Sequence, residues 1–124
     1  IEAFEQSGIT GLSDVKQPGE GITIVGRSEN PDQECAALSS IMEGADLSKP
    51  VFLLDHQPNA LGEAQEQGVD LTVSGHTHRG QVFPAHLITQ ALFENDWGYL
   101  QKGQMHSIVS SGYGFWGPPI RLGS

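Results

Sequence analysis

Three histidines follow two apolar segments of the chain, at the points where those segments end. His56 comes just after the run 51–54, and Gly75-His76-Thr77-His78 comes directly after the run 70–74. An apolar run of this length predicts a buried strand, and α/β proteins place their ligands at the carboxyl ends of such strands. Neutral imidazole is the commonest metal ligand in proteins. The pattern therefore indicates a metal site, although a lone histidine at a strand end is more often a hydrogen-bonded loop residue.

The segments around these histidines follow a strand, helix, strand pattern. Residues 50–54 and 70–74 each predict a strand. Between them, Pro58 opens a predicted helix that runs through Gln67 and ends at Gly68. A crossover of this length joins parallel strands in a βαβ unit. The two strands are therefore expected to lie side by side, which would bring their histidines together.

The segments before this unit predict a further strand and a helix. Residues 21–26 form a strand pattern, and residues 9–15 are a weaker strand candidate, expected as its hairpin partner. Residues 34–43 predict a helix, with Gly44 placed to end it. Its apolar side chains recur at helical spacing and are expected to face the core: Cys35, Leu38, Ile41 and Met42.

The segments after Pro84 have weaker patterns. Residues 87–93 predict one or two helical turns, and residues 97–100 and 105–110 predict a hairpin around Lys102-Gly103. Residues 112–117 match the dinucleotide pattern G-x-G-x-x-G, but the two prolines that follow argue against the helix that a dinucleotide site requires. We expect a glycine-rich loop there, serving either turn geometry and aromatic packing or substrate contact.

Composition limits the classes of function. The 124 residues, 37% of them hydrophobic, fit one domain with a modest core. Six basic residues against fifteen acidic ones, a formal charge of −9, argue against nucleic-acid binding, since phosphate backbones are bound through lysine and arginine. The single cysteine excludes an intrachain disulfide. No apolar run approaches the roughly 20 residues that span a bilayer, and no secretory signal is present, so this chain is expected to be soluble.

A strand-end histidine followed by Gly-His-x-His resembles the late motifs of the calcineurin-like metallophosphoesterases. Residues 79–84, Arg-Gly-Gln-Val-Phe-Pro, and the closing stretch 111–123 are similar to the bacterial branch of membrane-anchored phosphoesterases and phosphodiesterases. The resemblance implies an α/β fold, specifically the carboxyl-terminal half of a four-layer α/β/β/α sandwich. It also implies a metal-dependent hydrolase of phosphate monoesters or diesters, with a phosphoester as substrate and a parent protein anchored to a bacterial membrane.

The earlier motifs of that family do not occur in this sequence. These are Asp-x-His, Gly-Asp-x-x-Asp and Gly-Asn-His-Asp or Glu, which supply the bridging carboxylate, further ligands and the catalytic histidine. Residues 1–9 resemble the helix that follows the last of them. We therefore expect residues 1–124 to be the carboxyl-terminal part of one metallophosphoesterase domain, inactive alone, with its amino-terminal half elsewhere in a longer enzyme. Its exposed half-sheet is expected to pair with that half or with a second copy.

The resemblance also implies roles for the three histidines. His56 and His76 would bind one divalent ion and His78 the other, in a two-metal centre that uses manganese, iron or zinc. Because a His-x-His pair on an extended segment aims both rings in similar directions, a bend at Gly75 or Thr77 is expected. The alternatives are a non-catalytic metal-binding module built on the same histidines and an interaction module derived from the fold.

Neighbouring polar residues admit two roles each. Arg79 is placed to contact a substrate phosphate or to form a structural salt bridge. Asp55 is placed to orient a ligand imidazole or to cap the helix that Pro58 opens. Asn59 is a second candidate for capping that helix. Arg121 would bind an anion or serve packing. Two further histidines, His86 and His106, match no ligand motif and are expected to be ordinary surface or loop residues.

Overall fold

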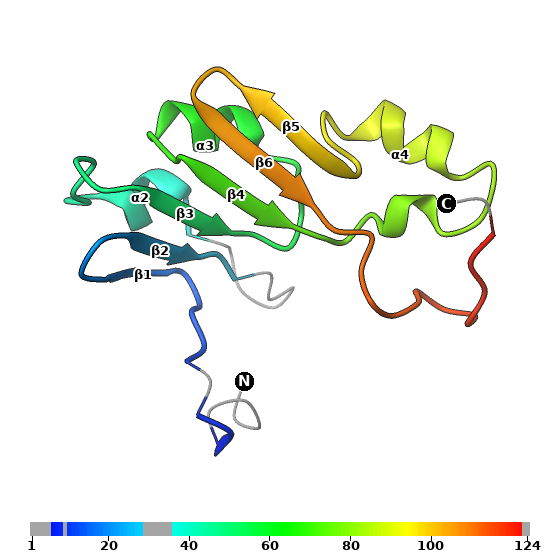
Figure 1. The fold of residues 1–124 in the computed structure, drawn as a ribbon, viewed down its shortest axis with the longest axis horizontal. Coiled ribbons are helices and arrows are strands. Elements are labelled where there is room, and N and C mark those ends of the chain that lie inside the picture. The colour runs from blue at the N-terminus through cyan, green and yellow to red at the C-terminus, as the bar shows by residue number, and fades with distance from the viewer. Residues whose placement is uncertain (1–5, 9, 29–35, 123–124) are drawn as a thin grey trace.

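The computed structural model describes residues 6–8, 10–28 and 36–122, which form a mixed sheet with short helices (Figure 1). The strands are β1 Val15–Pro18, β2 Thr23–Gly26, β3 Val51–Leu54, β4 Leu71–Ser74, β5 Gly98–Lys102 and β6 Met105–Val109. The helical elements are α2 Leu38–Met42, α3 Leu61–Glu66, the 3₁₀ turn η1 His78–Gly80 and α4 His86–Leu92.

The strand order in the sheet is β1-β2-β3-β4-β6-β5. The four inner strands β2, β3, β4 and β6 run parallel, and the two outer strands pair antiparallel to their neighbours. The carboxyl ends of the parallel strands therefore share one edge, and in Figure 1 their arrowheads point toward η1, α4 and the carboxyl-terminal segment. The predicted βαβ unit is confirmed, because β3 and β4 pair in parallel on either side of α3.

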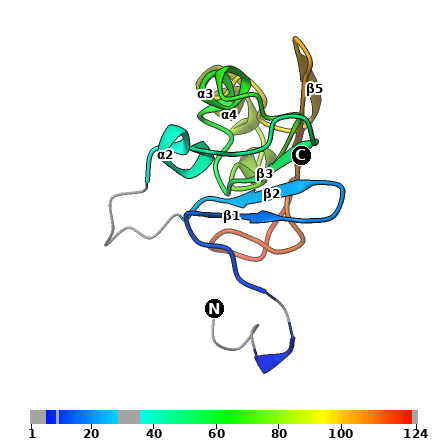
Figure 2. The same cartoon turned by 90° about the vertical axis from the view of Figure 1, so that its left-hand side faces the viewer.

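The hydrophobic core lies on one face of the sheet. Helices α2 and α3 cover this face, as Figure 2 shows from the side. Side chains that alternate along the strands point toward these helices, since neighbouring residues of a strand face opposite sides. The buried cluster contains Val25, Val51, Leu53 and Met105 from strands, Leu38, Ile41, Met42, Leu61 and Ala64 from helices, and Val69 from the turn after α3.

The opposite face of the sheet is apolar and open among the described residues. Leu54, Val73, Ile108 and Tyr99 are register partners across β3, β4, β6 and β5. Their exposed fractions are 45%, 37%, 44% and 61%. A contiguous apolar row of this kind is unusual on a sheet face that meets water. The described residues therefore form a sheet covered on one side, which matches the α/β class.

Several predicted elements are confirmed and several shift along the chain. The hairpin β5–β6, the helix α4 and the absence of a helix after the glycine-rich stretch 112–117 agree with expectation. The hairpin partner of β2 exists, but it is Val15–Pro18 instead of the segment 9–15. Gly19 and Ile22 close the turn, which places β1 directly before it.

The two inner helices are shorter than predicted. Helix α2 begins at Leu38 among the described residues, and Cys35 lies outside them. Helix α3 begins at Leu61 instead of Pro58, because Ala60 has non-helical backbone angles. The amino-terminal cap of α3 is Ala60, which makes no side-chain hydrogen bond, so neither Asp55 nor Asn59 is the cap residue that was predicted. No helix in the described part of the chain has both the length and the apolar character that crossing a membrane requires.

Candidate metal centre

The ends of β3 and β4 hold His56 and His76 against each other. Strand pairing continues past both strands, since Asp55 N–H donates to Val73 O at 3.2 Å and Gly75 N–H donates to His56 O at 3.0 Å. Nε2 of His56 lies 3.1 Å from Nδ1 of His76, and the two rings meet edge to face. Both side chains are exposed at the carboxyl edge of the sheet.

The chain turns sharply after β4 through a run of left-handed residues. His76, His78, Arg79 and Gln81 have φ values of 67°, 47°, 51° and 51°. The expected bend is therefore present, but it falls on the two histidines instead of Gly75 or Thr77. Each non-glycine residue in this region costs about 1–2 kcal/mol, and such strain gathers at functional sites.

Thr77 holds this turn in place. Its backbone is in the right-handed helical region, and its buried Oγ1 donates to Asp96 O at 2.6 Å. The same oxygen accepts from Arg79 N–H at 3.2 Å. Thr77 thereby ties the segment between the two histidines to the loop before β5.

His78 is half-buried beneath residues 110–121, which we call the carboxyl-terminal loop. A Cβ built on Gly112 would lie 3.2 Å from Cε1 and Nδ1 of the His78 ring, so the glycine allows this close approach. Nδ1 of His78 is buried and has no hydrogen-bond partner among the described residues. A buried polar atom without a partner is costly unless something else satisfies it.

The donors present fit a metal ion in type and spacing. Two imidazole nitrogens at bonds of about 2.0–2.1 Å around a tetrahedral ion lie about 3.3 Å apart, close to the 3.1 Å between His56 and His76. The orphaned nitrogen of His78 is a third donor of the same kind. However, in the described ranges no three histidine, cysteine or acidic side chains gather closely enough to hold an ion together.

A charged network lies next to His56. Arg27, after β2, contacts Asp55 Oδ2 at 3.3 Å and Glu63 Oε2 at 3.4 Å. Glu63 Oε1 also accepts from Leu38 N–H at 3.1 Å, which joins α3 to α2. The structure therefore gives Asp55 a role that the sequence did not predict: an ion pair with Arg27 that fixes the end of β3 against β2.

The arginines near the site have partners that the sequence did not reveal. Cζ of Arg79 lies 4.0 Å from the ring centroid of Trp97, a cation–π contact. Arg121 donates to the backbone oxygens of Ser111 at 3.0 Å and Gly114 at 3.3 Å. It also reaches His78 O at 3.5 Å. Arg121 thus serves to hold the carboxyl-terminal loop over His78.

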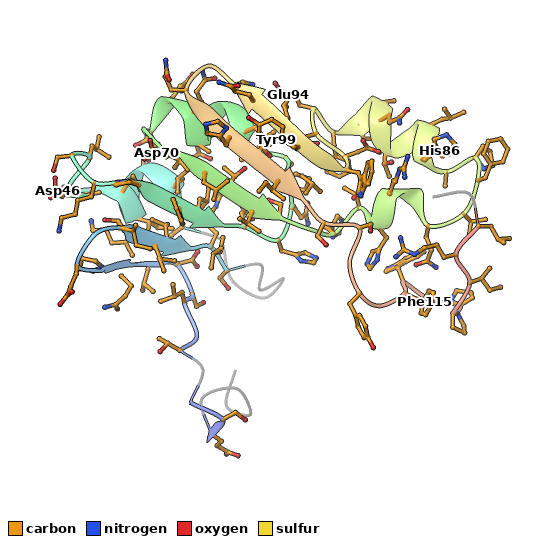
Figure 3. The ribbon with its side chains drawn as sticks, in the orientation of Figure 1. Asp46, Asp70, His86, Glu94, Tyr99 and Phe115 are labelled. Carbon is orange, nitrogen blue, oxygen red and sulfur yellow. The ribbon has the colours of Figure 1, made fainter. Side chains whose placement is uncertain are left out.

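The two other histidines lie outside this cluster. His106 accepts or donates a hydrogen bond of 2.7 Å with Tyr99 on the open face of the sheet. His86 begins α4, where its ring packs against Phe83. Figure 3 shows His86 on α4 and Tyr99 on β5.

Gln81 is a site residue that sequence reasoning missed. Its buried side-chain amide accepts from Trp116 N–H at 2.6 Å and donates to Trp116 O at 2.8 Å and Pro118 O at 3.2 Å. Its backbone oxygen accepts from Leu122 N–H at 3.0 Å. The signal in the sequence was an amide between a glycine and apolar residues. Its partners lie about 35 residues further along the chain, and no local pattern predicts a contact over that separation.

A pocket of about 320 Å³ opens beside the histidines. Its walls include both members of the His-x-His pair and side chains from η1, α4 and the carboxyl-terminal loop. The lining residues are His76, Thr77, His78, Gly80, Gln81, Thr89, Phe93 and Trp116. The site is thus an open pocket at the carboxyl edge of a parallel sheet, the usual ligand position in α/β proteins.

The fold and the site define an α/β protein with a histidine-based candidate metal centre, and curated relatives identify its family. A protein of Helicobacter pylori strain J99 named as an uncharacterized metallophosphoesterase is 40% identical over 87 residues, which cover 68% of this chain and 24% of the relative. An uncharacterized metallophosphoesterase of Aquifex aeolicus is 42% identical over 66% of this chain and 32% of its own length. A cattle protein named as a transmembrane protein with metallophosphoesterase domain is 37% identical over 70% of this chain and 20% of its own.

These relatives identify the chain as a homologue of metallophosphoesterases and confirm the predicted resemblance to the calcineurin-like family. The chain therefore belongs to the metallophosphoesterase family. The relatives come from animals as well as bacteria, so the family assignment extends beyond a bacterial branch. The chain spans only about a fifth to a third of the length of these three relatives. No family model matches the chain, and no solved structure matches it at a significant level.

Proposed function

We propose that this chain carries the late ligands of a two-metal phosphoesterase centre, with His56 and His76 on one divalent ion and His78 on the other. The observation that carries the proposal is the 3.1 Å approach of the His56 and His76 nitrogens at the ends of adjacent parallel strands. The buried, unpartnered Nδ1 of His78 supports a separate ion for that residue. The substrate is a phosphate monoester or diester, and the ions are manganese, iron or zinc.

The chain's own residues hold and orient the reacting groups. When bound, the ions supply activation of the attacking water and stabilisation of charge on the phosphoryl oxygens. His56 and His76, held by the ends of β3 and β4, would bind one ion, and Gly112 leaves room for the His78 ring, which would bind the other. Arg79 follows His78 directly and contacts the phosphate. Arg79 stacks on Trp97 with the face of its guanidinium, and its N–H donors lie in the guanidinium plane. The stack therefore leaves these donors pointing away from the Trp97 ring, where a phosphate could accept from them.

We further propose that the open face of the sheet packs against another part of a longer parent protein. The second sheet of a four-layer α/β/β/α sandwich would cover Leu54, Val73, Ile108 and Tyr99, whose exposure supports such a layer. The amino-terminal half would also bring the remaining metal ligands, so the chain alone is a poor catalyst. Some relatives are named as transmembrane proteins, which supports a parent protein anchored to a membrane.

Metal titration tests the ligand assignment without relying on activity. Calorimetric titration of the chain with Mn²⁺ or Zn²⁺ is expected to show binding that weakens more than tenfold in His56→Ala and His76→Ala. His106→Ala is the matched control, because His106 is an exposed histidine on the open sheet face and pairs with Tyr99. Equal binding by the wild type and both ligand variants would contradict the proposal.

A hydrolysis assay separates the enzyme from the non-catalytic alternatives. The purified chain is expected to leave a chromogenic phosphodiester unchanged in the presence of Mn²⁺, as is the double variant His76→Ala, His78→Ala. The same double variant in the full-length gene product should lose activity that the full-length wild type shows. A full-length wild type that binds metal without hydrolysis would favour the metal-binding module.

A further inference from the structure

A second hollow lies next to the histidine pocket, along the carboxyl-terminal loop. Its volume is about 300 Å³, and it shares Gly80, Gln81 and Trp116 with the first pocket. The remaining lining residues are apolar: Val82, Ala85, Pro118 and Ile120. The two hollows are therefore neighbours, lined by residues from His76 and His78 at one end to Ile120 at the other, and we call them together the loop groove.

Backbone pairing and the Gln81 amide build the loop groove. Phe83 N–H donates to Leu122 O at 2.8 Å, and Val82 pairs with Leu122 in a parallel bridge. The Gln81 side chain fixes Trp116 and Pro118 across from them. The groove walls are therefore set by hydrogen bonds within the chain, and its apolar side chains remain accessible. The exposed fractions are 38% for Val82, 76% for Trp116 and 49% for Ile120.

The loop groove carries no Asp, Glu, Lys or Arg among its lining residues, all of which the structure describes. The lining residues lie within 76–93 and 116–120, and the one charged residue in these ranges, Arg79, lines neither hollow. This is notable in a chain with fifteen acidic residues and a formal charge of −9. In Figure 3, Phe115 on this loop lies at the opposite end of the molecule from Asp46 and Asp70.

We propose that the loop groove binds an alkyl chain attached to the phosphate of the substrate. An uncharged, apolar groove favours a neutral hydrocarbon and gives no compensation for a second phosphate or a charged peptide. Because the apolar hollow shares three lining residues with the pocket of His76 and His78, a phosphate at the histidines would direct its alkyl chain toward Ile120. The substrate class is thus a lipid-like phosphoester, and this inference rests on the proposed function for the position of the phosphate.

A homologous series of alkyl phosphates tests the loop groove directly. Methyl, butyl and octyl phosphate, each below its micellar concentration, would be titrated into the chain and followed by NMR chemical shifts. Partial burial of each methylene is expected to tighten binding about twofold to threefold, so octyl phosphate should bind about tenfold to a hundredfold more tightly than butyl phosphate. Equal affinity across the series would overturn the proposal.

Variants along the groove locate the binding. Ile120→Ser removes an exposed side chain that lines only the outer hollow, so it should reduce the octyl-to-butyl ratio several-fold and leave butyl phosphate unaffected. Trp116→Ala should weaken both, because Trp116 lines both hollows. Tyr113→Ser is the matched control, since Tyr113 is fully exposed on the same loop and lines neither hollow. An equal loss of octyl phosphate affinity in Tyr113→Ser would indicate adsorption to the protein surface and overturn the proposal.

Two further readouts separate this inference from the metal proposal. The double variant His76→Ala, His78→Ala should lower the affinity for every alkyl phosphate by a similar factor and keep the octyl-to-butyl ratio. An octyl-to-butyl affinity ratio near one, together with normal metal binding, would reject the groove proposal and leave the metal proposal standing. Light scattering provides the other readout, because a dimer that Ile120→Ser converts to a monomer would show that a second copy fills the groove, and this result would also overturn the proposal.

Discussion

At the scale of the residue, the strained turn 76–81 shows how a short segment places two histidines beside one pocket. Four of its residues have left-handed backbone angles without being glycine. Their combined cost, about 1–2 kcal/mol each, must be offset by contacts that the turn makes elsewhere. Thr77 and Gln81 make those contacts, to the loop before β5 and to the carboxyl-terminal loop.

Gln81→Ala is expected to lower the free energy of unfolding by about 1–3 kcal/mol, because it leaves Trp116 N–H and two loop carbonyls without their partner. Urea unfolding followed by circular dichroism measures this change. Gln101→Ala is the control, since Gln101 is exposed and donates only to the nearby Gly103 O. Equal effects in the two variants would show that the Gln81 amide does not hold the loop.

The turn before β3 offers a test of a single titrating group. A hydrogen bond from the Ser48 hydroxyl, aided by the Ser48 backbone N–H, holds the pKa of Asp46 below its ordinary value. A carboxyl with a lowered pKa in the folded state adds stability above its unfolded pKa, and this contribution is lost as the pH falls through the folded pKa. Ser48→Ala should raise the pKa of Asp46 toward the ordinary value in an NMR titration, and an unchanged pKa would contradict the assignment.

At the scale of the element, the sequence predicted those parts that follow from local pattern. Apolar runs predicted β3 and β4, and the length between them predicted their parallel pairing, because these signals need only a few neighbouring residues. The start of α3 and the site of the bend after β4 were missed. The backbone of Ala60 and His76 depends on the turns and loops packed around them, which no run of neighbouring residues encodes.

Substitution by alanine should change the free energy of unfolding in opposite directions at two glycines, Gly80 in η1 and Gly62 in α3. Gly80→Ala is expected to cost at least about 2 kcal/mol, because Gly80 has φ 71° and its added Cβ would lie 2.3 Å from His86 N. Gly62→Ala is expected to add about 0.5–1 kcal/mol, since Gly62 lies in α3 with open space around it. Urea unfolding measures both. A neutral Gly80→Ala would show that η1 and α4 are not in close contact.

At the scale of the whole molecule, the α/β class was predictable and the surroundings of the candidate centre were predictable only in part. Strand-end histidines predicted that His56 and His76 lie at neighbouring strand ends, as the structure has them. The pocket beside His78 was not predictable, because it is formed by segments 80–93 and 110–121 that meet only in the folded chain. The metal-ligand roles of these histidines remain predictions that metal titration tests.

The open sheet face leads to a prediction about association. Leu54, Val73, Ile108 and Tyr99 form an exposed apolar row, and water contact with such a surface favours pairing. We therefore expect the isolated chain to dimerise through this face, with a mass in multi-angle light scattering that falls on dilution. Ile108→Lys places a charge at the centre of the row and should yield a monomer. Leu47→Lys is the control, because Leu47 is 60% exposed but lies in the turn before β3. A wild-type monomer that is stable to dilution would contradict this prediction, and a dimer that both variants keep would move the contact elsewhere.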